Sequence, residues 1–289
     1  MNRSSSFRKS GFTGLLLVGL VVLAAALCCG CIGNQDQTPA EVQTIAVTGS
    51  TTVLPVAQLA ADEYMRTHSS ADIQVSGGGS SVGVQAVGEG TADIGMASRD
   101  LKSAETEKYP SLVKHTVAID GIAVIVNPAN AVSSLSLDQI KGIYNGTITN
   151  WNQVGGASQE IVVVGRDSAS GTREFFYEFV MKKEDFVPTQ IEKNSNGAVK
   201  QTVQHTPGAI GYVGLGYLDG TVKAVSVGTD GTVVEATLEN VRAGTYPIAR
   251  ELYMFTTGEP TGLAKDYIDF ILSPDGQAIV EEEGFVRVN

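Results

Sequence analysis

Three short segments combine glycine with serine or threonine in a pattern suited to binding a small oxyanion. They span residues 49–55 (GSTTVLP), 76–83 (SGGGSSVG) and 165–173 (GRDSASGTR). Hydroxyl groups donate hydrogen bonds to an oxyanion, and glycine lets the backbone come close to it. The third segment adds arginine, whose planar fork of donors matches a pair of oxygen atoms. The three segments together predict an anion-binding site.

Each segment follows an expected strand and precedes an expected helix. The strands are 44–47, 73–75 and 161–164, and the helices are 56–67, 82–87 and 171–181. Ligands of open α/β sheets bind at the carboxyl ends of the strands, where a helix N-terminus offers unpaired N–H groups and a partial positive charge. One such loop is typical of any capped helix. Three in one chain, one with arginine, indicate a common site.

The rest of the body continues the alternation of strand and helix. Further strands are expected at 93–96, 117–126, 210–213 and 253–256, and further helices at 137–144, 198–204, 264–271 and 276–282. Alternation of this kind predicts an α/β fold with parallel sheets.

The overall charge argues against a nucleic-acid partner. The chain has 289 residues and a net charge of −11, with 20 basic and 31 acidic side chains, whereas nucleic-acid binding needs a basic face. A small anion is not excluded, because helix dipoles and one or two arginines decide its binding. The three histidines are spread along the chain without the spacing of metal ligands. We therefore expect neither a metal nor a cofactor.

The N-terminus has the pattern of a secretory signal peptide. Three basic residues lie among the first nine, and residues 11–27 are apolar. This run is short for a membrane span of about 20 residues, so export with removal of residues 1–30 is favoured over an uncleaved anchor. Both alternatives place the body outside the membrane.

All three cysteines lie between residues 28 and 31, so the body has no disulfide framework. A small residue before cysteine at the end of an apolar run resembles a lipobox, and Gly30-Cys31 fits it best. We expect a lipid on Cys31, a tether over residues 31–43 and anchoring to the outer face of the cell membrane. The alternative is that these cysteines simply belong to the apolar run.

Several motifs resemble those of the phosphate-binding components of ABC importers. The resemblance covers nearly all of residues 44–288, in order. It rests on 48–55 (TGSTTVLP), 78–83 (GGSSVG), 92–99 (ADIGMASR), 143–151 (IYNGTITNW), 166–172 (RDSASGT) and 208–213 (GAIGYV).

The resemblance implies a two-lobed periplasmic-binding-protein fold of type II, with the ligand in a cleft between the lobes. The chain would cross between lobes near Asp120 and near Gly244. Lobe I would then hold residues 44–120 and 244–289, and lobe II residues 121–243. The resemblance also implies hinge closure on phosphate and delivery to the membrane permease of an ABC transporter, and we expect a monomer.

Matching the family's ligand positions gives a set of hydroxyl, glycine and arginine residues. The implied ligands are Thr51, Thr52, Ser80, Arg166, Ser170, Gly171 and Thr172. A second group of candidates consists of Ser50, Ser81, Ser98 and Arg99.

One position departs from the family pattern. Better-known members carry an acidic residue where this chain has Arg99, and that residue accepts a hydrogen bond from protonated phosphate. Sulfate has no proton to give, and an acceptor left unpaired against it is costly. The fold with sulfate, molybdate or tungstate as ligand therefore remains an alternative.

A serine hydrolase is the alternative from another class. Residues 79–83 (GSSVG) match the Gly-x-Ser-x-Gly elbow, with Ser81 as the nucleophile. The mechanism needs an acid and a histidine later in the chain, and no motif marks His115 or His205 as that base. It also leaves the first and third segments unexplained, so we do not expect an enzyme.

Overall fold

The structure is a computed structural model that describes residues 41–229 and 231–289. The expected signal peptide, the expected lipid site at Cys31 and most of the expected tether lie outside the described residues. Among the described helices, none combines the length and the apolar character that a membrane crossing requires.

The body alternates strands and helices from its first strand onward. The strands are β1 (Gln43–Gly49), β2 (Ala71–Gly77), β3 (Ile94–Ala97), β4 (Leu112–Val126), β5 (Ser134–Ser136), β6 (Val162–Arg166), β7 (Ile191–Lys193), β8 (Ala209–Gly214), β9 (Lys223–Ala224), β10 (Ser226–Thr229), β11 (Thr232–Val234) and β12 (Ala249–Thr257). The α-helices are α1 (Leu54–Thr67), α2 (Ser80–Gly88), α3 (Ser103–Lys108), α4 (Leu137–Tyr144), α5 (Gly171–Phe179), α6 (Asn196–His205), α7 (Leu238–Arg242), α8 (Gly262–Leu272) and α9 (Pro274–Glu282). Short 3-10 turns cover Trp151–Val154 and Leu215–Tyr217.

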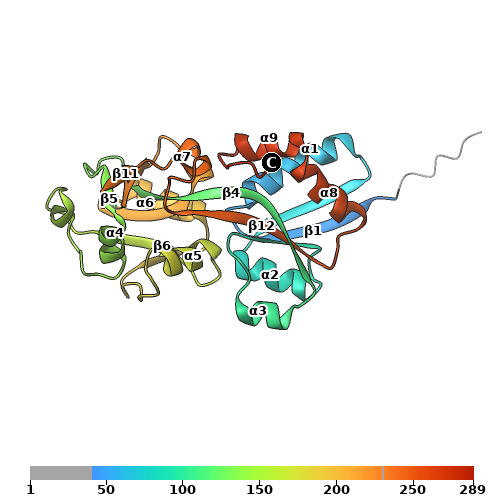
Figure 1. Cartoon of the computed structure of the whole chain (residues 1–289), viewed down its shortest axis with the longest axis horizontal. Helices are drawn as coiled ribbons and strands as arrows, with labels where there is room; N and C mark the ends of the chain where they lie inside the picture. The colour runs from blue at the N-terminus through green and yellow to red at the C-terminus, as the bar shows by residue number, and fades with distance from the viewer. Residues whose placement is uncertain (1–40, 230) are drawn as a thin grey trace, which may run out of the picture. The chain divides into compact units, whose positions relative to one another are not determined.

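The main sheet of the described chain runs in the order β2-β1-β3-β12-β4-β8-β6-β7, with β9 beside β4. β1 is parallel to β2 and β3, and β6 is parallel to β7 and β8, which confirms the expected parallel α/β arrangement on each side. The long strands β4 and β12 pair antiparallel in the middle of the sheet and extend into both sides (Figure 1). A small second sheet has the order β11-β10-β5.

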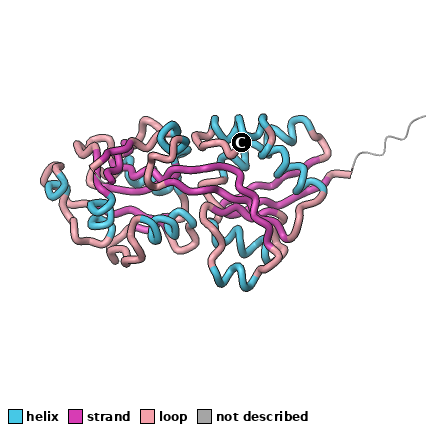
Figure 2. Tube along the Cα trace, viewed as in Figure 1, coloured by secondary structure: helices cyan, strands magenta, loops and turns pink. Residues whose placement is uncertain are grey.

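Two large apolar cores lie on either side of the β4–β12 pair. One is built from residues 45–118 and 252–285, and the other from residues 122–248 with Val286. Helices α1, α8 and α9 cover one face of the first side, and α2 and α3 lie on its other face (Figures 1 and 2). Along β4, and again at the start of β12, side chains that belong to one core are followed within a few residues by side chains that belong to the other.

Close packing of α2 against β1 and β3 fixes the position of the second predicted loop. A Cβ atom at Gly83 would lie 2.6 Å from the Met96 carbonyl oxygen and 2.7 Å from that of Thr48. No real Cβ atom comes so near to a backbone oxygen, so the helix can lie this close to the sheet only with glycine at this position. The helix N-terminus, with Ser80, is held at the carboxyl ends of these strands.

We predict that Gly83→Ala lowers the free energy of unfolding by roughly 1–3 kcal/mol, the range for overpacking. The loss from overpacking outweighs the gain in helix propensity of about 1 kcal/mol that alanine has over glycine. Gly197→Ala in α6 is the matched control, because no atom lies within 4 Å of its added Cβ; it should be neutral or stabilising. Urea unfolding without added anion measures both, and equal stability of the two variants would refute the packing argument.

Candidate anion-binding site

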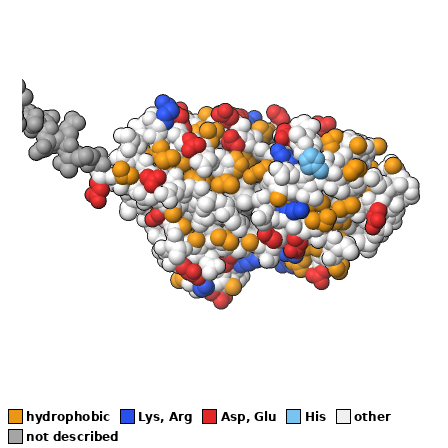
Figure 3. Space-filling model, turned by 180° about the vertical axis from the view of Figure 1, so that it is seen from behind, with side chains coloured by type: hydrophobic (Ala, Val, Ile, Leu, Met, Phe, Trp, Pro, Cys, Tyr) orange, Lys and Arg blue, Asp and Glu red, His pale blue; other side chains and the backbone are white. Residues whose placement is uncertain are grey.

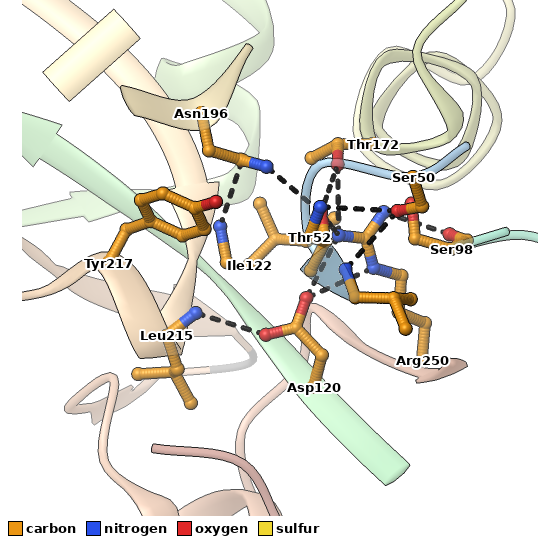
Figure 4. A network of polar contacts seen from close by, with 12 residues as sticks. Ser50, Thr52, Ser98, Asp120, Ile122, Thr172, Asn196, Leu215, Tyr217 and Arg250 are labelled. Carbon is orange, nitrogen blue, oxygen red and sulfur yellow. Dashed lines mark hydrogen bonds and ion pairs between the residues drawn. The ribbon is translucent and has the colours of Figure 1, made fainter. Parts of the chain in front are cut away.

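The structure brings the three predicted loops together. Thr52 Oγ1 of the first loop lies 3.1 Å from Thr172 Oγ1 of the third (Figure 4). The backbone N–H of Ser81 in the second loop donates to the carbonyl of Ala169 in the third, at 3.1 Å. The loops come from β1, β2 and β6, so residues more than 100 positions apart in the chain meet at one place.

In the first loop, the hydroxyls of the two threonines contact Asn196, which lies on the other side of the β4–β12 pair. The amide of Asn196 donates to Thr51 Oγ1 at 3.1 Å and to Thr52 Oγ1 at 3.0 Å. The hydroxyl of Ser50 instead accepts from the N–H groups of Thr52 and Val53, at 3.2 and 3.4 Å. Ser50 therefore shapes the start of α1, and the threonines face the centre.

The second loop contributes Ser80, which is fully buried. Its Oγ accepts from the N–H of Ser98 at 3.0 Å and lies 3.3 Å from Ser98 Oγ. A Cβ atom at Gly171 would lie 2.2 Å from Ser80 Oγ and 2.8 Å from Ser98 Oγ. The first residue of α5 thus lies directly against two serines of the opposite side.

The third loop ends in a capped helix, as predicted. Ser170 is the N-cap of α5, and its Oγ accepts from the N–H of Arg173 at 3.2 Å. Gly171 and Thr172 form the first turn, where N–H groups have no partner within the helix and the dipole is positive. Thr172 and Ser170 are both buried at this end.

Arg166 is almost completely buried, with 1% of its surface exposed. Its Nε donates to the carbonyl of Lys193 and its Nη2 to that of Asn194, both at 3.1 Å. Burial lowers the pKa of Arg166, whereas Tyr212 and Asp167 nearby act to raise it. Carbonyl groups carry no net charge, so they orient the guanidinium without neutralising it.

Arg99 is held in an ion pair. Its two terminal nitrogens each lie 2.7 Å from an oxygen of Glu105, and it also donates to Ser81 Oγ at 3.0 Å. Burial would raise the pKa of Glu105, but hydrogen bonds from Arg99 and from the Lys102 N–H hold it below its ordinary value. Arg99, in the loop before α3, is therefore the ion-pair partner of Glu105 in that helix.

Sequence reasoning missed four residues of this cluster: Asp120, Asn196, Tyr217 and Arg250. Asp120 and Arg250 pair with each other, and the Tyr217 hydroxyl donates to the carbonyl of Thr51. Asn196 begins α6 directly after its N-cap Ser195, so a fourth strand-to-helix junction could have been found from the pattern Ser-Asn-Gly. No comparable pattern marks the other three.

The buried charges of the described chain gather in this region. They are Arg99, Asp120, Arg166 and Arg250. Together with Glu105, which pairs with Arg99, these residues hold three positive and two negative charges, and Asp167 beside Arg166 is a third negative charge that acts on Arg166. The chain as a whole carries −11. On the face drawn in Figure 3, acidic and basic side chains are interspersed, whereas three buried arginines gather where the loops meet.

A surface ion pair also joins the two sides of the β4–β12 pair. Lys102 Nζ, in the loop after β3, lies 2.8 Å from Glu174 Oε2 on α5. Beside α5 lies a groove of about 750 Å³ lined by Arg173, Tyr177 and Phe186, and none of the predicted ligand residues lines it. The predicted residues lie instead where the loops pack against one another.

The geometry around Ser81 does not suit a nucleophile. Its hydroxyl accepts from Arg99, and the ring nitrogen of His115 bonds to Thr256 Oγ1 at 2.9 Å. No hydrogen bond of the described residues joins a histidine to Ser81. In residues 41–229 and 231–289, no three histidine, cysteine or acidic side chains form a group that could hold a metal ion.

Comparison with known proteins identifies the family. A model described as a PBP superfamily domain matches residues 34–275. The phosphate-binding protein PstS of Bacillus subtilis is 37% identical over 285 residues, covering 95% of this chain and 92% of that protein. PstS of Borreliella burgdorferi is 30% identical and covers 94% and 98%. A substrate-binding protein from Clostridium perfringens, solved with bound phosphate, is 40% identical with a TM-score of 0.80 and covers 86% of this chain and 100% of its own.

We predict that Glu105→Gln lowers the free energy of unfolding at neutral pH by roughly 3 kcal/mol, because it leaves Arg99 buried without a counter-ion; this is the low end of the range for a buried pair, since Glu105 is partly exposed. The folded pKa of Glu105 lies below the unfolded value of about 4.3, so its contribution is present above that value and lost as pH falls through the folded pKa.

Urea unfolding of the unchanged protein and of Glu105→Gln, at pH values from neutral to acid, measures this loss of stability. The stability difference between them should shrink as the pH falls. Glu63→Gln, which breaks an exposed pair with Arg66, is the matched control and should leave stability unchanged. A difference that stays constant down to the lowest pH would contradict the assignment.

Proposed function

The chain belongs to the PBP superfamily and, within it, to the phosphate-binding proteins, and from this membership we propose how its own residues hold the anion. It is an extracytoplasmic solute-binding protein that captures phosphate for an ABC importer. The ligands that we propose are the hydroxyl and backbone groups of the three loops with Arg166. They are Thr51, Thr52, Ser80, Arg166, Ser170, Gly171 and Thr172.

The observation that carries this proposal is the meeting of the three loops beside buried arginines. Thr52 and Thr172 come from opposite sides of the β4–β12 pair, and their hydroxyls lie 3.1 Å apart. An anion that accepts from both hydroxyls would replace this contact and join the two sides. Helix N-termini and a buried guanidinium would then supply positive potential without water between them.

We propose that the two sides are lobes that close on the anion. Lobe I would hold residues 44–120 and 244–289, and lobe II residues 121–243. The separate cores support two lobes. Because Tyr246 and Ile248 pack in the core of the second side, the cores favour a second crossing closer to residue 250 than to Gly244. Contacts such as the Lys102–Glu174 pair would form only when the cleft closes. The chain would act as a monomer and would catalyse no reaction.

Arg99 supports anion binding indirectly in this proposal, because Glu105 already neutralises it. Ser50 and Ser81 also act indirectly in this proposal, because the hydroxyl of Ser50 accepts from the N–H of Thr52 and that of Ser81 accepts from Arg99. Ser98 lies against Ser80 and is the remaining candidate of the second group. Phosphate is the ligand that the relatives favour, and sulfate and molybdate are the comparison anions that test selectivity.

The test is isothermal titration of the full chain, stripped of bound anion, with phosphate and then with sulfate and molybdate. We expect tight binding of phosphate and weaker binding of the other two. Tight binding of sulfate or molybdate instead would keep the fold and replace the ligand. No heat with any oxyanion would overturn the proposed function.

Arg166→Ala should weaken phosphate binding by about 2 kcal/mol or more, because a buried charged donor is lost. This corresponds to roughly a thirtyfold or greater loss of affinity. Arg173→Ala is the matched control on the same loop, since its guanidinium lies over the ring of Phe186 at 4.8 Å. Titration of both variants decides: equal affinities would remove Arg166 from the site.

We further propose that Cys31 carries the lipid that holds the protein on the outer face of the membrane. Cys31→Ala should move the protein from the membrane fraction to the soluble fraction, because one buried acyl chain contributes about 0.8 kcal/mol per methylene group. Cys28→Ala, in the same short segment, should leave the protein membrane-bound. Continued sedimentation of Cys31→Ala with membranes would contradict the lipid assignment.

A further inference from the structure

Asp120 and Arg250 form a buried ion pair at the centre of the β4–β12 pair. They are cross-strand partners in the register of these strands. Arg250 Nη2 lies 2.9 Å and its Nε 3.2 Å from Asp120 Oδ2, and the N–H of Leu215 donates to Asp120 Oδ1 at 3.0 Å. Asp120 is fully buried and Arg250 is 6% exposed. The pair therefore lies where the chain passes between the two proposed lobes.

The guanidinium of Arg250 is directed at the hydroxyls of the cleft (Figure 4). Its Nη2 lies 3.0 Å from Thr172 Oγ1 and 3.3 Å from Thr52 Oγ1, and its Nη1 donates to the carbonyl of Ser98 at 2.9 Å. Thr52 and Thr172 are two of the proposed phosphate ligands. An anion that bonds both hydroxyls would therefore lie within a few ångströms of this positive charge.

A purely structural role explains this arrangement poorly. Removing two charges from water costs more than their attraction returns in many buried pairs, and apolar residues can replace them without loss of stability. Arg250 also uses its donors on neutral hydroxyl groups, which compete weakly for a guanidinium compared with an anion. The charged and titratable groups around it are Asp120 on β4, Arg166 at the end of β6 and Tyr212 on β8.

We propose that Arg250 is a further phosphate-binding residue, and that Asp120 limits the positive charge that Arg250 offers to the anion. This inference rests on the proposed function. Without phosphate, Asp120, the two threonine hydroxyls and the Ser98 carbonyl accept from the donors of Arg250. When phosphate binds, it accepts from Arg250 and the hydroxyls together, and Asp120 keeps the net charge of the cleft low.

The two members of the pair should then act on affinity in opposite directions. Arg250→Gln removes a positive charge and should weaken phosphate binding at least roughly tenfold. Asp120→Asn keeps a side chain of the same shape with an oxygen acceptor and removes the negative charge. It should leave phosphate binding as tight as in the unchanged chain or tighter, although the ligand-free protein becomes less stable because Arg250 loses its counter-ion.

The experiment is titration of the full chain with inorganic phosphate at neutral pH, together with thermal unfolding with and without phosphate. Arg250→Lys keeps the charge without the planar fork and should bind with intermediate affinity. Arg242→Gln is the matched control, because Arg242 pairs with Glu281 at the surface and should not affect binding. In Asp120→Asn, phosphate should raise the melting temperature by more than it does in the unchanged chain, because it supplies the missing negative charge.

Weaker binding by Arg250→Gln together with unchanged or tighter binding by Asp120→Asn would support the inference. If both weaken binding to the same extent, the pair is only a structural support and the inference is wrong. It is also wrong if Arg250→Gln folds and binds phosphate normally. Failure of the unchanged chain to bind phosphate would overturn the proposed function, and this inference with it.

Discussion

Burial of charge is the constraint on which the arrangement of the cleft depends. A charged group removed from water must be paired or hydrogen-bonded, or folding becomes unfavourable. Arg99 meets this requirement with Glu105 and Arg250 with Asp120, whereas Arg166 meets it with two uncharged carbonyl groups. The third solution satisfies the donors without a direct ion pair, although Asp167 lies beside Arg166. An acidic chain thereby keeps an arginine inside whose donors meet neutral groups.

The parts of the site that could be predicted from the sequence are those that local chain geometry produces. A β-branched run followed by Gly and Ser or Thr specifies a strand, a tight turn and a capped helix within about ten residues. The expected helix at 56–67 is observed as α1 (Leu54–Thr67), and the expected start of α5 at Gly171 is confirmed. The carboxyl ends of parallel strands lie at one edge, so the meeting of the first two loops followed from the fold class. The third loop follows β6, which runs opposite to β1, and its place against them was implied only by the two-lobed fold of the resembling family.

The parts that could not be predicted depend on contacts between distant segments. Asp120 and Arg250 are 130 residues apart and meet only because of the register between β4 and β12. The expected strand at 253–256 was too short to include Arg250, because the charged residues at the start of β12 interrupt the apolar pattern that predicts a strand. Helix α3 was also missed: it has six residues, none of them buried, so no apolar pattern marks it. Its Glu105 is what engages Arg99.

Gly171 gives the cleft a lower limit of width. The backbone of α5 begins where the smallest side chain, a methyl group, would overlap Ser80 Oγ at 2.2 Å. Only a hydrogen atom on the Cα of residue 171 therefore fits between α5 and Ser80. Any larger residue would push the start of α5 away from Ser80 and Ser98. The close approach of the two sides thus rests on an absent side chain as much as on the side chains that are present.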